Sequence, residues 1–314
     1  MTFPETADDA DVIRVACWNV EHNGLPGHTA GGDDRRWHLA HEVLRAHRPH
    51  IVLRQELTLA HLDGKRTLHE EGKALGLSAV MAPGNPESPN PTGVLYDPQI
   101  FALHAEYTHV TNGWHPICNP VLTLRGDTEA TKPLSLASFH LCPYDPATRE
   151  TEAKRLLTLG SQKRTAIIGG DCNSYPHRIA AESVPLPDWD EVTDPAHFEH
   201  RTVRTAFGRI SDTIPDEVLA STKPGGGRIF VELGHHAATE LAQPSALEAT
   251  ASLWRTGKGH RSRIDRMYCT ADLASALRSL EVFADDTVAE VSDHALVLAT
   301  FDREAFRRVL TPAR

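Results

Sequence analysis

Polar side chains recur at the ends of apolar runs in this sequence, and their chemical types suit hydrolysis of a phosphoester. Carboxylate and amide oxygens without a cluster of cysteines favour Mg²⁺, Ca²⁺ or Mn²⁺ over structural zinc. A carboxylate that can orient or deprotonate water, with a histidine and amide donors, completes the groups that this reaction needs. The candidate residues are Asn19, Glu21, Glu56, His140, Asp171, Asn173, Asp265, Asp293 and His294.

Two short motifs carry more weight than single residues. Asp171-Cys-Asn173 follows an apolar run and two glycines, and glycine lets the backbone turn sharply and expose both polar side chains. Ser292-Asp-His294 stands directly before another apolar run. A lone carboxylate at a strand end is explained equally well as a helix cap or a solvated edge. The joint pattern, and no single position, therefore predicts the site.

Alternating apolar residues predict the strands that must position these groups. In residues 12–21 a side-chain period of two places Asn19 and Glu21 on the face of Ile13 and Cys17. A second strand, 50–56, ends at Glu56. Further strands are expected at 79–81, 93–96, 101–110, 120–124, 133–140, 165–170, 263–269, 280–283 and 295–301, and helices before Pro49, at 65–75, 146–159 and 272–277, and at the C-terminal end. Without strict βαβ alternation, this order predicts two packed sheets with helices outside.

Six short motifs, taken in order, give the chain a resemblance to a known superfamily. They are Trp18-Asn-Val-Glu21, Gln55-Glu56, His140, Gly170-Asp-Cys-Asn173, Arg263-Ile-Asp265 and Ser292-Asp-His294. Together they resemble the endonuclease/exonuclease/phosphatase (deoxyribonuclease-I-like) superfamily. The resemblance implies an α/β (α+β) fold, a four-layer sandwich of two packed mixed β-sheets flanked by helices. It places the site at one end of the two sheets.

The resemblance also implies a metal site. Glu56 is expected to be the principal ligand of a Mg²⁺ or Mn²⁺ ion, helped by Asn19, Glu21 and Asp293. Glu21 resembles the acidic residue that AP endonucleases keep at this position, although its side chain is longer.

Catalytic roles follow from the same resemblance. Asp171 is expected to orient or activate the attacking water, and Asn173 to contact phosphate. His294, oriented by Asp265, would contact or protonate the phosphoryl group. His140 stands where deoxyribonuclease-like and sphingomyelinase-like members keep a histidine and AP endonucleases tend to keep a tyrosine. The subfamily therefore stays open.

Two arginines near the fifth motif are expected to bind substrate. Arg263 belongs to the motif, and Arg266 follows it where an aromatic residue is frequent in the family. A guanidinium group beside the site would attract phosphate.

The domain organisation is predicted from local composition. Residues 1–11 are expected to be a flexible leader, and 12–314 a single domain. Residues 174–262 lack a regular rhythm and are expected to be a variable insert that could form a wall of the substrate site.

Composition and charge restrict the functional classes. The 314 residues include 32 Lys and Arg against 42 Asp and Glu, a net charge of −10, which argues against coating nucleic acid by charge alone. A nuclease is not excluded, because carboxylates that hold a cation also make a chain acidic. No stretch suits a membrane span, and the N-terminal residues do not resemble a secretory leader. With five widely spaced cysteines, these features predict a cytoplasmic protein with reduced thiols.

Three functions compete at this point. The favoured one is a divalent-metal-dependent phosphodiesterase or phosphatase, in the broad sense, that acts on a phosphorylated small molecule. The alternatives are a nuclease acting on DNA or RNA, and an inactive binding module on the same fold. No obligate protein partner is evident.

Overall fold

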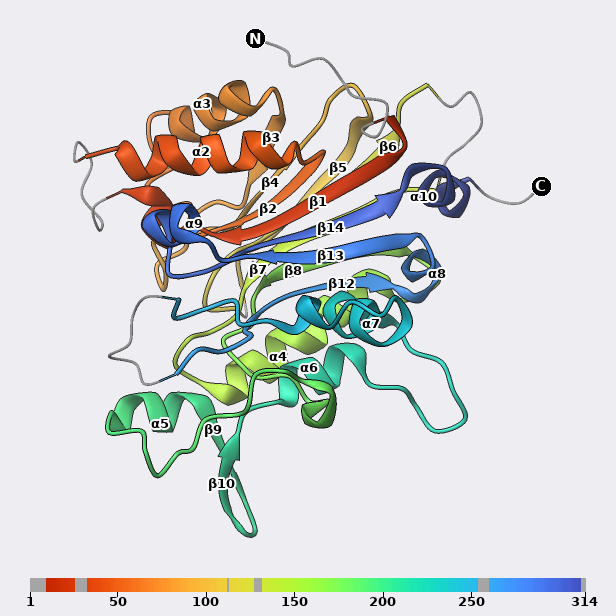
Figure 1. Cartoon of the computed structure of the whole chain (residues 1–314). Helices are drawn as coiled ribbons and strands as arrows, with labels where there is room; N and C mark the ends of the chain where they lie inside the picture. Colours follow the sequence, from red (N-terminus) through yellow and green to blue (C-terminus); the bar gives the residue numbers. More distant parts are fainter. Residues whose placement is uncertain (1–9, 26–32, 112, 127–131, 254–259, 312–314) are drawn as a thin grey trace.

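Two six-stranded sheets form the centre of the molecule (Figure 1). The structure, a computed structural model, describes residues 10–25, 33–111, 113–126, 132–253 and 260–311, so most of the predicted leader 1–11 lies outside the described residues. The first sheet has the order β13-β14-β1-β2-β4-β3 and the second β11-β12-β8-β7-β6-β5. Both are mixed, because β1 pairs in parallel with β2 and β7 with β8, while the other neighbours are antiparallel.

Eleven of the twelve strands in these two sheets were predicted, and β11 was not; β13 also begins at Leu277, which was predicted to end a helix. The first sheet consists of β1 (Val12–Asn19), β2 (Ile51–Gln55), β3 (Ser78–Met81), β4 (Gly93–Tyr96), β13 (Leu277–Phe283) and β14 (Leu296–Asp302). The second consists of β5 (Phe101–His109), β6 (Ile117–Leu124), β7 (Leu134–His140), β8 (Thr165–Asp171), β11 (Phe230–Glu232) and β12 (Asp265–Thr270).

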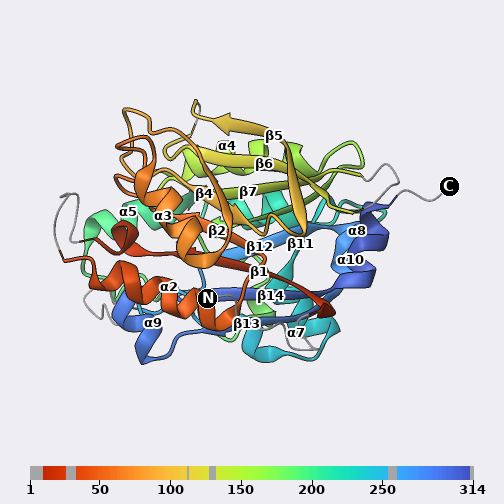
Figure 2. The ribbon, with the colours of Figure 1, turned by 90° about the horizontal axis from the view of Figure 1, so that it is seen from above.

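Helices cover the outer faces of the two sheets, which completes the predicted four-layer sandwich. The helices α2 (Arg35–His47), α3 (Arg66–Leu75) and α9 (Asp286–Val291) pack on the first sheet, and α4 (Pro146–Leu157) and α6 (Ile214–Ala220) on the second. Figures 1 and 2 show α8 (Ala271–Ala274) and α10 (Arg303–Leu310) at one end of the sandwich, and α5 (Pro195–Arg201) and α9 at the other. Within the described ranges, every helix is too short or too polar to cross a lipid bilayer.

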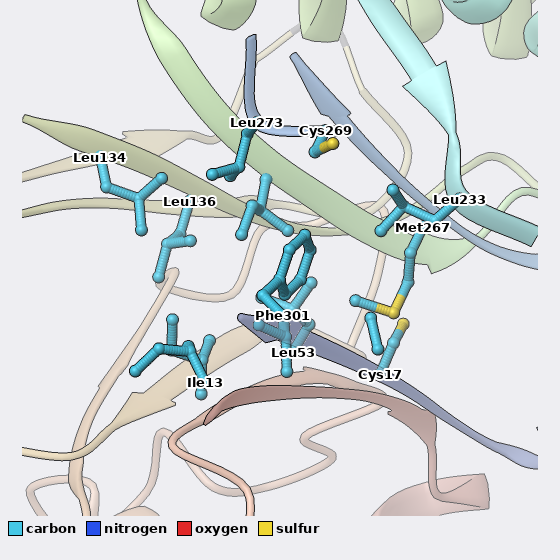
Figure 3. Packing of buried hydrophobic residues seen from close by; sticks show 14 of the residues in the cluster. Ile13, Cys17, Leu53, Leu134, Leu136, Leu233, Met267, Cys269, Leu273 and Phe301 are labelled. Atoms are coloured by element: carbon cyan, nitrogen blue, oxygen red, sulfur yellow. The ribbon is translucent and has the colours of Figure 1, made fainter. Parts of the chain in front are cut away.

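The core between the sheets is built from the inward faces of their strands. Figure 3 shows Cys17, Leu53, Leu136, Met267 and Phe301 pointing toward one another from both sheets. Burial of such apolar area from water is the main stabilising contribution to the fold. All five cysteines are buried with free thiols, as the sequence predicted.

Two local predictions need correction. β1 ends at Asn19, and Glu21 begins a short 3₁₀ turn in which His22 has a φ of 51°, so Glu21 does not continue the strand. The glycines before Asp171 lie inside β8 and do not make a turn. A Cβ atom at Gly170 would lie 1.7 Å from the carbonyl oxygen of Phe139, so this glycine is required by the close approach of β7.

The segment 174–262, predicted to be an insert, contributes to both the fold and its surface. Its later part supplies α6, the edge strand β11 and helix α7 (Leu233–Glu240), which packs against β12 and β13. Its earlier part holds α5 and a hairpin of β9 (Thr202–Thr205) and β10 (Gly208–Ser211), which projects from the body in Figure 1. Helix α5 therefore lies close to the strand ends that carry the candidate residues.

Candidate active site

A cleft of about 320 Å³ lies at the end of the sandwich where β1, β2, β7 and β8 terminate. Parallel pairing brings Asn19 beside Gln55, which precedes Glu56, and His140 beside Asp171. Antiparallel pairing adds Asp265 opposite Asp171. Strand register gathers the groups within each sheet, and the packing of the two sheets brings both sets together, as the contact between Asn19 and Asp171 shows.

Glu56 and Asn19 form one side of this site. The amide nitrogen Nδ2 of Asn19 donates to Glu56 Oε1 at 3.2 Å and to Asp171 Oδ2 at 3.4 Å. The backbone N–H of His22 donates to Glu56 Oε2 at 2.8 Å. The oxygen Oδ1 of Asn19 is buried without a hydrogen-bond partner among the described residues. A buried acceptor of this kind beside a carboxylate fits a hard divalent cation.

Asp171 lies at the centre of the cleft. Its Oδ1 accepts the backbone N–H of Asn173 at 2.8 Å, and its Oδ2 lies 3.4 Å from Nε2 of His140. Burial would raise the pKa of Asp171, but the positive charges of His140, His294 and Arg201 outweigh it and lower that pKa. Asp171 is therefore an ionised acceptor.

Asn173 turns the chain away from β8. Its φ of 47° is the left-handed conformation that asparagine tolerates, and its Nδ2 donates to the carbonyl oxygen of Leu141 at 2.8 Å. This bond orients the amide at the cleft wall.

His294 and Asp265 form a buried pair on the far side of Asp171. Nδ1 of His294 lies 2.8 Å from Asp265 Oδ2, and Nε2 of His294 lies 3.9 Å from Asp171 Oδ2. Burial alone would lower the pKa of His294, but Asp265, Asp171 and Asp293 raise it to about 10. The imidazolium form therefore donates from Nδ1 to Asp265 and keeps a proton on Nε2.

Asp171, Asp265 and His294 also place one potential ligand atom each within 4.8 Å of one another, the one such group among the described residues. A cation there would have to displace the proton that Asp265 and His294 share. The oxygen donors of Glu56 and Asn19 are the better cation site, because metal ligands must be deprotonated.

Glu21 and Asp293 line the same cleft on the side of Glu56. Oε2 of Glu21 lies 3.3 Å from Nη2 of Arg36, whose Nε also donates to the carbonyl oxygen of Val291 at 2.8 Å. Oδ1 of Asp293 lies 3.8 Å from Nε2 of His294. Arg36 was not predicted as a site residue, because in the sequence it is one of several cations on a helix.

Arg263 and Arg266, which were expected to bind substrate, do not line the cleft. Arg263 pairs with Glu182 at 2.6 Å and with Glu232 at 3.0 Å, both as buried contacts. Arg266 is fully buried and donates to the hydroxyl oxygen of Tyr268 at 2.9 Å. Neither arginine lines the cleft, because their charges are used to attach the 174–262 segment to β12.

Part of the cleft wall was not predicted residue by residue. No short motif marks these positions, which come together only in the folded chain. His115 stacks on His140, with ring centroids 4.0 Å apart and planes inclined by 18°. The other members of this wall are Tyr144, Tyr175, His197, Arg201 and His260.

Solved structures share this architecture over almost the whole chain, although no protein-family model and no curated protein sequence matches it. A humanized D. rerio TDP2 is 14% identical with a TM-score of 0.60, covering 93% of this chain and 99% of that one. An endonuclease/exonuclease/phosphatase from Bacteroides vulgatus is 12% identical with a TM-score of 0.61, covering 93% and 98%. This chain has the endonuclease/exonuclease/phosphatase fold.

ANGEL2, a 2′,3′-cyclic phosphatase in complex with adenosine-2′,3′-vanadate, has the same fold. It is 14% identical with a TM-score of 0.57, covering 93% of this chain and 95% of that one. Structural similarity at identities this low establishes the fold alone. The chemistry must therefore be argued from the residues of the cleft.

Proposed function

We propose that this protein is a divalent-metal-dependent phosphoester hydrolase, a phosphodiesterase or phosphatase in the broad sense. The observation that carries the proposal is the convergence of Glu56, Asn19, Asp171 and the His294–Asp265 pair on one cleft. These groups come from both sheets. An oxygen-rich cation site, an ionised acceptor and a protonated donor are the elements of metal-assisted hydrolysis.

Mg²⁺ or Mn²⁺ would be held by Glu56 and Asn19, with Glu21 and Asp293 on the same side of the cleft. The donor set fits such an ion, because it consists of oxygens and includes the buried Oδ1 of Asn19 that has no partner among the described residues. When bound, the cation would neutralise charge on the phosphoryl oxygens.

Asp171 would orient the attacking water and accept its proton. The Asn19 amide and the His140 ring fix this carboxylate, so it needs no reorganisation before the reaction. His294 would offer the Nε2 proton to a phosphoryl oxygen, while Asp265 holds the ring and its charge. Asn173, which also lines the cleft, would contact the phosphate.

A phosphorylated small molecule is the favoured substrate. The cleft volume of about 320 Å³ lies near the lower end of the ~300–1,000 Å³ range of small-molecule sites. The net charge of −10 also disfavours a polyanion. Nucleic acid stays the second candidate, because TDP2 has been solved with a single-strand DNA product. We expect the enzyme to act in the cytoplasm.

Hydrolysis of p-nitrophenyl phosphate and bis(p-nitrophenyl) phosphate, and nicking of supercoiled plasmid, test the proposal with Mg²⁺ and with Mn²⁺. EDTA should abolish activity, and added cation should restore it. Asp171→Asn keeps the shape of the side chain but removes its charge, and should lower kcat at least about 100-fold. Asp302→Asn, a change at the end of β14 far from the cleft, is the matched control.

Three results would contradict parts of the proposal. Activity that survives EDTA would show that the enzyme needs no divalent cation. An Asp171→Asn variant as active as the parent would show that Asp171 does not activate the attacking water. A folded parent that is inactive on every phosphoester would favour the binding module.

A further inference from the structure

Arg201 is a cation of the cleft that forms no ion pair with the described residues. It ends α5 and lines the cleft together with Asp171. Its guanidinium group makes no hydrogen bond or ion pair of 4.0 Å or less with any residue in the described ranges. Burial lowers the pKa of Arg201, and attraction to Tyr175, Asp171 and Asp212, none of them in contact with its guanidinium group, opposes this only in part. Arg201 is partly exposed and lines the cleft, and its charge has no acidic partner among the described residues. An anionic group of a ligand would supply that partner.

The backbone that carries Arg201 is held firmly. Nη2 of Arg149 donates to the carbonyl oxygen of His200 at 2.6 Å, and the carbonyl oxygen of Arg201 accepts the N–H of Asp212 at 2.9 Å. The Asp212 carboxylate cannot compensate Arg201, because it already accepts from Arg149 Nε at 2.8 Å and from the N–H of Ile214 at 3.1 Å. The backbone at Arg201 is thus held in place, while its side chain has no acidic partner among the described residues.

Two other residues of the cleft lining, Tyr175 and His260, add no negative charge. The hydroxyl of Tyr175 lies 3.1 Å from Nε2 of His260. Burial raises the pKa of Tyr175 to about 12 and, with the charge of Arg201, lowers that of His260, so both are neutral at pH 7. Nδ1 of His260 is buried without a partner among the described residues. The cleft lining therefore includes an unpaired cation and a second polar atom, His260 Nδ1, without a partner among the described residues.

We infer that Arg201 binds a second phosphoryl group of the substrate, next to the one that reacts. The inference rests on the proposed function for the identity of the reacting group. The reacting phosphoryl group already has His294 and the cation site at Glu56. Arg201 comes from α5 and not from a strand end, and its guanidinium group does not pair with Asp171. Its planar fork suits bidentate binding of a phosphate.

Two kinds of molecule offer a pair of phosphates with this chemistry. One is a small bisphosphorylated compound, and the other is an oligonucleotide whose neighbouring phosphate occupies the position of Arg201. The site recognises the same group in both cases, so the experiment must separate the two sources.

Binding measured without turnover tests the inference. The full chain is titrated in metal-free buffer with adenosine 5′-monophosphate, adenosine 3′,5′-bisphosphate and the 5′-phosphorylated dinucleotide of adenosine. At least one doubly phosphorylated probe should bind about tenfold or more tightly than the monophosphate. Arg201→Ala should abolish that preference, and Arg201→Lys should retain part of it.

The control variant is Arg204→Ala, which removes the same charge from the exposed hairpin outside the cleft. It should keep the preference of the parent. Because the Arg201 side chain makes no hydrogen bond to a described residue, Arg201→Ala should also keep the parent's melting temperature.

Each outcome decides the inference. Preference for the bisphosphate supports a small molecule, and preference for the dinucleotide supports an oligonucleotide. The inference is overturned by a parent without preference, by a preference that survives Arg201→Ala, or by equal loss for all three probes, which would assign Arg201 to the reacting phosphate. If the parent prefers a doubly phosphorylated probe and Arg201→Ala abolishes this preference, but no phosphoester is hydrolysed, only the proposed activity is contradicted.

Discussion

His41 makes the stability of this protein dependent on pH below neutrality. Its ring is buried in α2, against the edge of Trp37 at 4.0 Å between centroids and 3.9 Å from Glu71 Oε1. Burial, only partly offset by Glu71 and reinforced by Arg54, lowers the pKa of His41 from 6.5 to about 4. The folded state thus holds this ring neutral, whereas the unfolded chain protonates it near pH 6.5.

The size of the effect follows from linkage. A group with a lowered folded-state pKa contributes its full stabilisation above the unfolded pKa, and loses it as pH falls from 6.5 toward 4. At about 1.4 kcal/mol per pH unit, the free energy of unfolding should fall by about 2 kcal/mol between pH 7 and pH 5 because of this residue alone. His41→Phe keeps a ring but cannot bind a proton, so it should lack this part of the pH dependence.

Urea denaturation of the parent and of His41→Phe at both pH values measures the difference. Any free-energy cost of repacking around Phe is the same at both pH values, so it cancels in the difference between them. His38→Gln, a change at an exposed histidine on the same helix, is the control and should keep the slope of the parent. Equal slopes for the parent and His41→Phe would refute the reasoning. The effect matters to the cleft, since Glu71 holds Arg54, which supports Asn23 in the turn after β1 at 2.9 Å.

Two further predictions concern how the cleft is supported. Arg149→Met should lower the free energy of unfolding by about 3–5 kcal/mol, measured by denaturation, because it leaves the fully buried Asp212 carboxylate uncompensated. A loss below about 1 kcal/mol would show that water reaches this pair. Gly170→Ala should prevent accumulation of folded protein, assayed by soluble expression and circular dichroism, because its Cβ atom would overlap the Phe139 carbonyl. Gly64→Ala, whose Cβ would meet nothing within 4 Å but whose φ is 68°, should cost only about 1 kcal/mol.

The parts of the structure that local pattern controls could be predicted from the sequence. Strand ends were recognisable because apolar alternation stops there, and Asn19, His140 and Asp171 are the last residues of their strands. Their convergence was then a consequence of two parallel pairs ending at the same edge. Glu21 marks the limit of this reasoning, because the 3₁₀ turn after β1 does not follow from a period of two.

Arginine shows why the substrate wall could not be predicted in the same way. Arg263 and Arg266 stand beside a motif, yet their charges are balanced by Glu182, Glu232 and Asp216, which lie far away in the sequence. Arg201 stands in no motif and lacks such a partner among the described residues. Proximity in sequence does not identify the partner of a long charged side chain, whereas a charge in a cleft without a partner points to a ligand. Substrate selection should therefore be sought in α5, while the strand ends supply chemistry that many substrates could share.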